Sequence, residues 1–212
     1  MTLVRWDGNI GIEVGGRSLM TSHDHGSEDE LGAVVANAVT ASAAPRVLIG
    51  GLGLGFTLRA ALDALPRAAT VEVAELVPEV VAWNRGAQGV LAKRPLRDKR
   101  VVVLIEDVAA VIKRGRDYDA ILLDVDNGPD ALVHRGNAGL YKRAGLVRAK
   151  QALRPGGVLA VWSAFGSRTF TQWLEEVGFA VTLQRTKPTT PGGPRYYIWL
   201  ARRAAPRTKP GR

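Results

Sequence analysis

The chain has 212 residues, of which 46% are hydrophobic and 23% are charged, and this is the composition of a globular protein with one sizeable core. It carries a formal net charge of +9 and no cysteine, so disulfide bonds and thiolate metal sites are excluded. No apolar run approaches the ~20 residues needed to span a bilayer, and the first eight residues show no signal-peptide pattern. We therefore expect a cytoplasmic protein without membrane contact.

The first residues predict a small β structure. Apolar residues alternate with polar ones between 10 and 21 and flank a Gly15-Gly16 turn, which indicates a β-hairpin. Ser27 and Glu30 then have capping-box spacing, so we expect a helix to open at Ser27. The hairpin and its flanks, residues 1–26, form the expected N-terminal extension.

Strands and helices alternate along most of the remaining chain. Strands are predicted at 46–50, 70–75, 101–105, 119–124, 158–163, 179–184 and 195–201. Helices are predicted at 55–65, 78–85, 107–113, 138–153 and 167–177, with a loop at 86–100 and a turn at 154–157. This alternation predicts an α/β domain over 27–203, with a Rossmann-like fold and a mostly parallel seven-stranded sheet covered by helices on both faces. The last two strands have no helix between them and are expected to pair antiparallel.

The end of the chain is strongly basic. Five basic residues occupy the last eleven positions: Arg202, Arg203, Arg207, Lys209 and Arg212. We expect residues 204–212 to form a disordered basic tail. Such a tail could contact nucleic acid, but no basic helix face with interleaved aromatic residues occurs elsewhere, so a solubilising tail is the simpler interpretation.

A glycine cluster after the first predicted sheet strand is the clearest functional signal. The segment 47–57 is an apolar run that ends in Gly51, Gly53 and Gly55 and leads into a helix. Twenty positions past Gly55, the next strand ends on Glu75. This is the pattern of a nucleoside-binding crevice, in which the glycines permit a tight turn and the acid accepts hydrogen bonds from a ribose diol.

The spacing of the glycines excludes two phosphate-binding motifs. The dinucleotide pattern G-x-G-x-x-G requires a third glycine where this chain has Phe56 or Leu58. The P-loop pattern requires a lysine at the position of Phe56. The pattern resembles motif I of the class I S-adenosylmethionine transferases, whose ligand carries no phosphate.

Several segments together resemble the catalytic domain of spermidine synthases, which is itself a class I methyltransferase-type fold. The resemblance covers about residues 45–165 and is carried by Val47–Arg59, Val71–Val81, Ile105–Asp107, Tyr118–Asp124 and Leu153–Leu159. It implies a transferase whose co-substrate is S-adenosylmethionine or its decarboxylated form, and whose acceptor is a small amine. It also implies that Glu75 binds the ribose hydroxyls, Asp107 binds the adenine amino group and Asp124 is the catalytic residue.

The chemistry of these residues agrees with the resemblance. Asp124 ends a parallel strand at the crevice and could take the proton that an amine of pKa ~10 sheds before it attacks. Asp126 enlarges the negative field there and Asn127 stands where the family has a second aspartate, so both are candidate substrate-binding residues. Each assignment has a structural alternative: a solvated strand end for Glu75, a helix N-cap for Asp107 and a turn cap for Asp124.

The chain also departs from the spermidine synthases. Gly53 stands where the family has an aspartate that holds the aminopropyl amine of the donor. Gly26-Ser27 replaces a Tyr-His pair before Glu28, and the β-rich N-terminal domain is reduced to a short hairpin. A methyltransferase that uses intact S-adenosylmethionine is therefore an alternative, as is a non-catalytic nucleoside- or nucleic-acid-binding module.

Other features predict less. His23 and His25 form an H-x-H pair without a third ligand, so we expect no metal site. Trp162 and Ser163 end a predicted strand near the crevice, where Trp162 could form part of a substrate wall. The oligomeric state stays open, with a homodimer among the alternatives.

Overall fold

The computed structural model describes residues 1–40, 42–125, 128–129, 138–189 and 192–205. Its N-terminal sheet consists of β1 (Thr2–Trp6), β2 (Asn9–Val14) and β3 (Arg17–Thr21). The strands of the central sheet are β4 (Arg46–Gly50), β5 (Thr70–Ala74), β6 (Val101–Leu104), β7 (Tyr118–Leu123), β8 (Leu153–Ser163), β9 (Phe179–Arg185) and β10 (Tyr197–Arg203).

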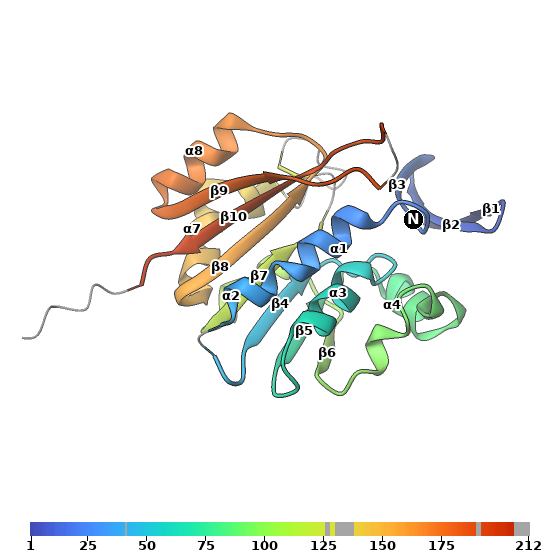
Figure 1. Cartoon of the computed structure of the whole chain (residues 1–212), viewed down its shortest axis with the longest axis horizontal. Helices are drawn as coiled ribbons and strands as arrows, with labels where there is room; N and C mark the ends of the chain where they lie inside the picture. Colours follow the sequence, from blue (N-terminus) through green and yellow to red (C-terminus); the bar gives the residue numbers. More distant parts are fainter. Residues whose placement is uncertain (41, 126–127, 130–137, 190–191, 206–212) are drawn as a thin grey trace, which may run out of the picture.

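The helices lie between these strands along the chain (Figure 1). They are α1 (Gly26–Ala33), α2 (Val35–Ala38), α3 (Phe56–Ala64), α4 (Pro78–Arg85), α5 (Val108–Arg114), α6 (Ala138–Tyr141), α7 (Arg143–Ala152) and α8 (Arg168–Glu176). Two 3₁₀ turns, η1 (Ala87–Val90) and η2 (Pro95–Arg97), interrupt the loop that was predicted at 86–100.

The central sheet has the strand order β6-β5-β4-β7-β8-β10-β9. Strands β6, β5, β4, β7 and β8 are parallel, whereas β10 is antiparallel to both of its neighbours, β8 and β9. The predicted α/β fold with a mostly parallel seven-stranded sheet is therefore confirmed, as is the antiparallel pairing of the last two strands.

Helices cover both faces of this sheet because successive residues of a strand point to opposite sides. In β4, Val47 and Ile49 pack in one core with α1, α2, α3 and α4. Leu48 packs in the other core with α5, α6, α7 and α8. Figure 1 shows α1, α2 and α3 on the near side of β4 and β7. Because β4, β5, β6 and β7 are parallel, the loops that follow them lie together at the carboxyl end of the sheet.

The N-terminal structure is larger than the predicted hairpin. Residues 2–6 form an additional strand, β1, which pairs antiparallel with β2 from Thr2↔Glu13 to Trp6↔Asn9. The connecting Asp7-Gly8 turn has φ values of 43° and 80°, the left-handed geometry that favours this dipeptide in two-residue hairpins. The result is a three-stranded antiparallel sheet rather than a hairpin.

The predicted capping box at Ser27 is wrong. Helix α1 begins at Gly26 with His25 as its N-cap, and no side chain caps its amides. Ser27 lies inside the helix and donates to Oε2 of its neighbour Glu28 at 2.5 Å. Glu30 instead accepts a hydrogen bond from the backbone amide of Lys187 at 2.8 Å.

Two other boundaries differ from the predictions. The helix predicted at 138–153 is divided into α6 and α7 at Lys142, which has an extended backbone. The turn predicted at 154–157 is the irregular start of β8, where Gly156 has φ of 83° and the pairing with β7 shifts register after Tyr118. Within the described residues, no helix has the length and hydropathy that a membrane crossing requires.

Candidate active site

A cavity of about 420 Å³ lies at the carboxyl ends of the parallel strands, between the central and N-terminal sheets. Five predicted site residues line it: Gly51, Gly53, Glu75, Asp107 and Asp124. They come from the loops after β4, β5, β6 and β7, which the parallel sheet brings to one edge. Gly55 is not among the lining residues and serves as the N-cap of α3. Asp126 and Asn127 lie outside the described residues.

The glycine loop after β4 lies very close to other parts of the chain at two of its glycines. Gly51 has φ of 88°, and a Cβ there would lie 2.2 Å from the carbonyl oxygen of Asp124. Gly53 has φ of 51°, and a Cβ there would lie 2.5 Å from Sδ of Met20. This sulfur also accepts a hydrogen bond from the amide of Leu54 at 3.2 Å, so β3 is attached directly to the loop.

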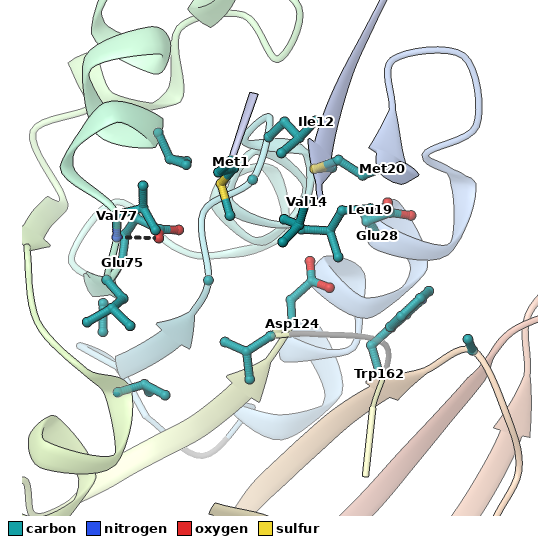
Figure 2. Close-up of a pocket in the computed structure, with 18 of the residues that line it drawn as sticks. Met1, Ile12, Val14, Leu19, Met20, Glu28, Glu75, Val77, Asp124 and Trp162 are labelled. Atoms are coloured by element: carbon teal, nitrogen blue, oxygen red, sulfur yellow. Dashed lines mark hydrogen bonds between the residues drawn. The ribbon is translucent and has the colours of Figure 1, made fainter. Parts of the chain in front are cut away.

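Glu75 follows β5 and is buried, with 8% of its surface exposed. Its Oε2 accepts a hydrogen bond from the amide of Leu52 at 2.9 Å, and its Oε1 accepts one from the amide of Val77 at 2.8 Å (Figure 2). The alternative in which Glu75 is only a solvated strand end is therefore wrong. Each carboxylate oxygen keeps a second lone pair with which it can accept from a ligand hydroxyl.

Asp107 has the structural role that the sequence left open. It is the N-cap of α5, where its Oδ1 accepts a hydrogen bond from the amide of Ala109 at 2.8 Å. The side chain is nevertheless exposed and lines the cavity. The cap is thus confirmed, and Oδ2 is left to face a ligand.

Asp124 follows β7 and points into the cavity (Figure 2). Its Oδ2 accepts a hydrogen bond from Oγ1 of Thr57 at 2.6 Å. Burial raises the pKa of this carboxyl to about 6, although the Thr57 hydroxyl acts in the opposite direction. The alternative in which Asp124 caps the following turn concerns residues 126–127, which lie outside the described residues; the partner of Asp124 in the described part of the chain is Thr57.

Glu28 is a member of this site to which the sequence assigned no role. It lies on α1, is 8% exposed and faces the same cavity as Asp124 (Figure 2). Burial is the largest cause that raises the pKa of Glu28 to about 8, followed by the charge of Asp124. The helical spacing of α1 could have shown that Glu28 lies one turn before Leu31, on the face that packs against α3.

The cavity also has an aromatic wall. The rings of Trp162 and Tyr196 line it with their centroids 5.1 Å apart. Trp162 is 8% exposed, and its Nε1 has no hydrogen-bond partner within the described part of the chain. The predicted wall position of Trp162 is confirmed, whereas nothing in the sequence pointed to Tyr196.

The charge of the cavity is opposite to that of the whole chain. Six acidic residues line it: Asp24, Glu28, Glu75, Glu106, Asp107 and Asp124. No lysine, arginine or histidine does so among the described residues, although the formal net charge is +9. A concave site with acids of one sign concentrates the field and favours a cationic ligand.

Among the described residues, the two histidines of the H-x-H pair do not share a cluster with a third metal ligand. His25 pairs with Asp29 at 2.8 Å, and its ring stacks on Phe56 with centroids 3.9 Å apart. In the described ranges of the chain, no three histidine or acidic side chains form a cluster that could hold a metal ion.

Comparison with known proteins shows which proteins are similar to this chain in sequence and in fold. No family model matches the chain. Over 103 residues the chain is 39% identical to polyamine aminopropyltransferase 2 of Caldanaerobacter subterraneus subsp. tengcongensis. The match covers 46% of this chain and 33% of that relative, so the similarity spans about a third of the relative's length.

Solved structures extend the similarity to nearly the whole chain. Spermidine synthase from Thermotoga maritima has a TM-score of 0.72 at 18% identity, over 92% of this chain and 66% of that one. A spermidine synthase in complex with the transition state analogue AdoDATO has a TM-score of 0.71 at 16% identity, over 96% and 72% of the two chains. An S-adenosylmethionine-dependent O-methyltransferase from Thermotoga maritima has a TM-score of 0.58 at 18% identity, over 85% and 67%.

The fold is that of the S-adenosylmethionine-dependent methyltransferase superfamily. Within the superfamily the fold is spermidine-synthase-like, and part of the chain is a distant homologue of a polyamine aminopropyltransferase.

Proposed function

We propose that the chain is a transferase that moves an alkyl group from a sulfonium nucleoside to an amine. The donor is S-adenosylmethionine or its decarboxylated form. The observation that carries this proposal is the acidic cavity on the glycine loop, where Glu75, Asp107 and Asp124 share one wall.

The residues of the cavity fit a nucleoside that carries no phosphate. Glu75 offers acceptor lone pairs for a ribose diol, beside a glycine loop whose backbone a ligand can approach. Asp107 offers Oδ2 to the exocyclic amine of a purine. The volume of about 420 Å³ falls within the range of ~300–1,000 Å³ that is usual for small-molecule sites.

The opposite end of the cavity fits an amine acceptor. Asp24 and Asp124 supply negative charge there, Glu28 adds a carboxyl group whose pKa of about 8 keeps it protonated at neutral pH, and the rings of Trp162 and Tyr196 supply aromatic faces. Carboxylates and aromatic faces both attract an ammonium group. Asp126 and Asn127 are proposed to add to this acceptor site from the following loop.

Asp124 is the proposed catalytic residue. The amine nitrogen attacks the carbon next to the sulfonium, and the carbon–sulfur bond breaks with its electron pair going to sulfur, which becomes a neutral thioether. The nitrogen sheds one proton, which Asp124 accepts directly or through water. The donor is already activated, so the main contribution of the protein is alignment of the two reactants.

The charge of the cavity favours the decarboxylated donor and hence aminopropyl transfer. The substituent of that donor ends in a cation, whereas intact S-adenosylmethionine adds a carboxylate that would face the acidic residues. Methyl transfer is the second candidate, because Gly53 leaves the glycine loop without an anion that would select the decarboxylated form.

Calorimetric titration with the two donors tests the proposal. We expect the decarboxylated form to bind about tenfold more tightly or better, which corresponds to about 1.4 kcal/mol. Asp24→Asn, which removes a negative charge from the cavity wall, should reduce that preference, and the exposed control Glu79→Gln should not. Tighter binding of intact S-adenosylmethionine would favour methyl transfer, and no binding of either donor would overturn both candidates.

A further inference from the structure

Thr57 contacts the proposed catalytic aspartate without lining the cavity itself. It lies in the first turn of α3, is 3% exposed and is absent from the cavity wall. Helices α1 and α3 approach closely at this point, since a Cβ on Gly32 would lie 2.4 Å from the carbonyl oxygen of Thr57. Glu28 is four residues before Gly32, on the same face of α1. Thr57 therefore lies at the contact between α3 and α1, the helix that carries Glu28, and its hydroxyl reaches Asp124 at the end of β7.

The hydroxyl of Thr57 has one proton to donate, and it donates it to Asp124. The distance from Oγ1 to Oδ2 is 2.6 Å, the length that is usual for a hydroxyl donating to a carboxylate. A threonine hydroxyl in a helix often bonds the carbonyl oxygen four residues earlier. Here that oxygen, on Gly53, accepts a hydrogen bond from Nδ2 of Asn84 at 2.8 Å. No hydrogen bond to Oδ1 of Asp124 is present among the described residues, and the Asp124 side chain points into the cavity.

The acidic groups around Asp124 make its hydrogen bond with Thr57 important for its ionisation. Among the described residues, the titratable side chains that share the cavity wall with Asp124 are Asp24, Glu28, Glu75, Glu106, Asp107 and Tyr196, and Met1, which carries the α-amino group, also lines it. Burial and the neighbouring acids both favour the neutral form of a carboxyl group here. The hydrogen bond from the Thr57 hydroxyl lowers the pKa of Asp124 and so opposes the effect of burial, which raises that pKa. Asp124 thus has a pKa of about 6, below the value of about 8 at Glu28.

We propose that Thr57 is a positioning residue of the transfer reaction. Its hydroxyl holds one oxygen of Asp124, directs the other toward the acceptor amine, and keeps Asp124 rather than Glu28 as the ionised carboxyl that takes the proton. This role rests on the proposed function, because it acts through the proposed catalytic residue. The location of Thr57 depends on the packing of α1 against α3.

Carbon-13 NMR titration of the side-chain carboxyl groups tests the proposal without a ligand. Thr57→Val removes the hydroxyl at nearly constant volume, Thr57→Ser keeps it, and Asp124→Asn identifies the resonance. A hydrogen bond to a charged group contributes about 1.5–3 kcal/mol, so the titration midpoint of Asp124 should rise by about 1–2 pH units in Thr57→Val. Thr57→Ser should return it close to the parent value.

A control separates this effect from the loss of any hydrogen-bonded threonine hydroxyl in a helix. Thr171 on α8 accepts a hydrogen bond from Nε1 of Trp199 at 2.8 Å and lies outside the cavity wall. Thr171→Val should leave the titration of Asp124 unchanged. An unchanged midpoint in Thr57→Val, or an equal shift in Thr171→Val, would overturn the proposal.

Kinetics with decarboxylated S-adenosylmethionine and 1,4-diaminobutane provide the second readout. In Thr57→Val we expect kcat to fall about tenfold or more, KM for the donor to stay within about twofold, and the acidic limb of the pH profile to move upward with the NMR midpoint. A fall in activity without a shift of the acidic limb would mean that Thr57 is only structural. If the parent protein shows no transfer with either donor, the proposed function fails, and the NMR titration still decides the role of Thr57.

Discussion

The amide of Leu52 donates a 2.9 Å hydrogen bond to Oε2 of Glu75, so the acid that follows β5 holds the glycine turn that follows β4. The other oxygen of Glu75 accepts from the amide of Val77 and fixes the carboxylate at the start of α4. The residue proposed to bind the ribose is therefore oriented by the backbone of two neighbouring loops. A ligand would find this carboxylate already in position.

Glu75→Gln should weaken nucleoside binding and lower stability together. A glutamine has one acceptor oxygen, so its NH₂ group would face one of the two backbone amides and leave that amide unpaired. We expect a loss of about 1–3 kcal/mol in the free energy of unfolding and at least tenfold in affinity for methylthioadenosine. Thermal unfolding and calorimetry measure the two effects. Glu79→Gln, on the exposed first turn of α4, should change neither by a comparable amount.

Asp124→Asn should abolish turnover and spare donor binding. The amide oxygen can still accept from Thr57, so the local structure is retained, but the side chain can no longer take a proton. Removal of a general base costs about 10²–10⁴-fold in kcat. We expect affinity for methylthioadenosine to stay within about twofold. Turnover equal to that of the parent protein would refute the role of Asp124.

Glu28→Gln should stabilise the protein at alkaline pH. The pKa of Glu28 is raised from 4.5 to about 8, so between these values the folded chain retains a proton that the unfolded chain releases. The contribution of Glu28 to the free energy of unfolding is therefore fully present below about pH 4.5. It decreases as pH rises and is lost above about pH 8. Glutamine stays neutral throughout, and we expect a gain on the order of 2–4 kcal/mol at pH 9.

The Glu28→Gln variant is also measured at pH 5, where its gain in the free energy of unfolding should be close to zero. Glu175→Gln, on the exposed side of α8, is the control for the loss of a surface carboxylate. Chemical denaturation at both pH values measures these differences. An equal effect of Glu28→Gln at pH 5 and pH 9 would show that Glu28 does not titrate in this range.

Gly53→Asp and Met20→Ala should be energetically coupled. A Cβ at Gly53 would lie 2.5 Å from Sδ of Met20, so the aspartate alone should destabilise the fold by about 1–3 kcal/mol through crowding. Aspartate tolerates the left-handed backbone of this position better than most residues. Met20→Ala supplies the missing space, and the double variant should be less destabilised than the sum of the two single variants.

The same double variant tests donor selection. An aspartate at position 53 would add an anion on the glycine loop, and the double variant should prefer decarboxylated S-adenosylmethionine more strongly than the parent protein does. Unfolding measurements on all four proteins give the coupling energy. Additive effects would show that Met20 does not occupy the space of a side chain at position 53.

The sequence predicted the parts of the site that are determined locally. A glycine loop after a strand and acids at successive strand ends are short-range patterns, and Gly51, Glu75 and Asp124 were found from them because a parallel sheet aligns its carboxyl ends. The additional strand β1 could also have been predicted, since Asp7-Gly8 is a strong hairpin signal. The irregular start of β8 could not, because Pro155 and two glycines have the composition of a turn.

The remaining members of the site come from contacts distant along the chain. Met20 meets the glycine loop across 34 residues, and Thr57 meets Asp124 across 67. Glu28 acquires its altered pKa from the packing of α1 over the cavity, which helical periodicity alone does not reveal. Such residues are ordinary in the sequence, and only the tertiary fold gives them a role.

A crystal structure of the complex with methylthioadenosine would test the central claim most directly. The account predicts that the nucleoside lies on residues 51–55 with both ribose hydroxyls within hydrogen-bond distance of the Glu75 carboxylate, and with its sulfur toward Asp124. A nucleoside bound outside this cavity, or one whose ribose makes no contact with Glu75, would contradict it.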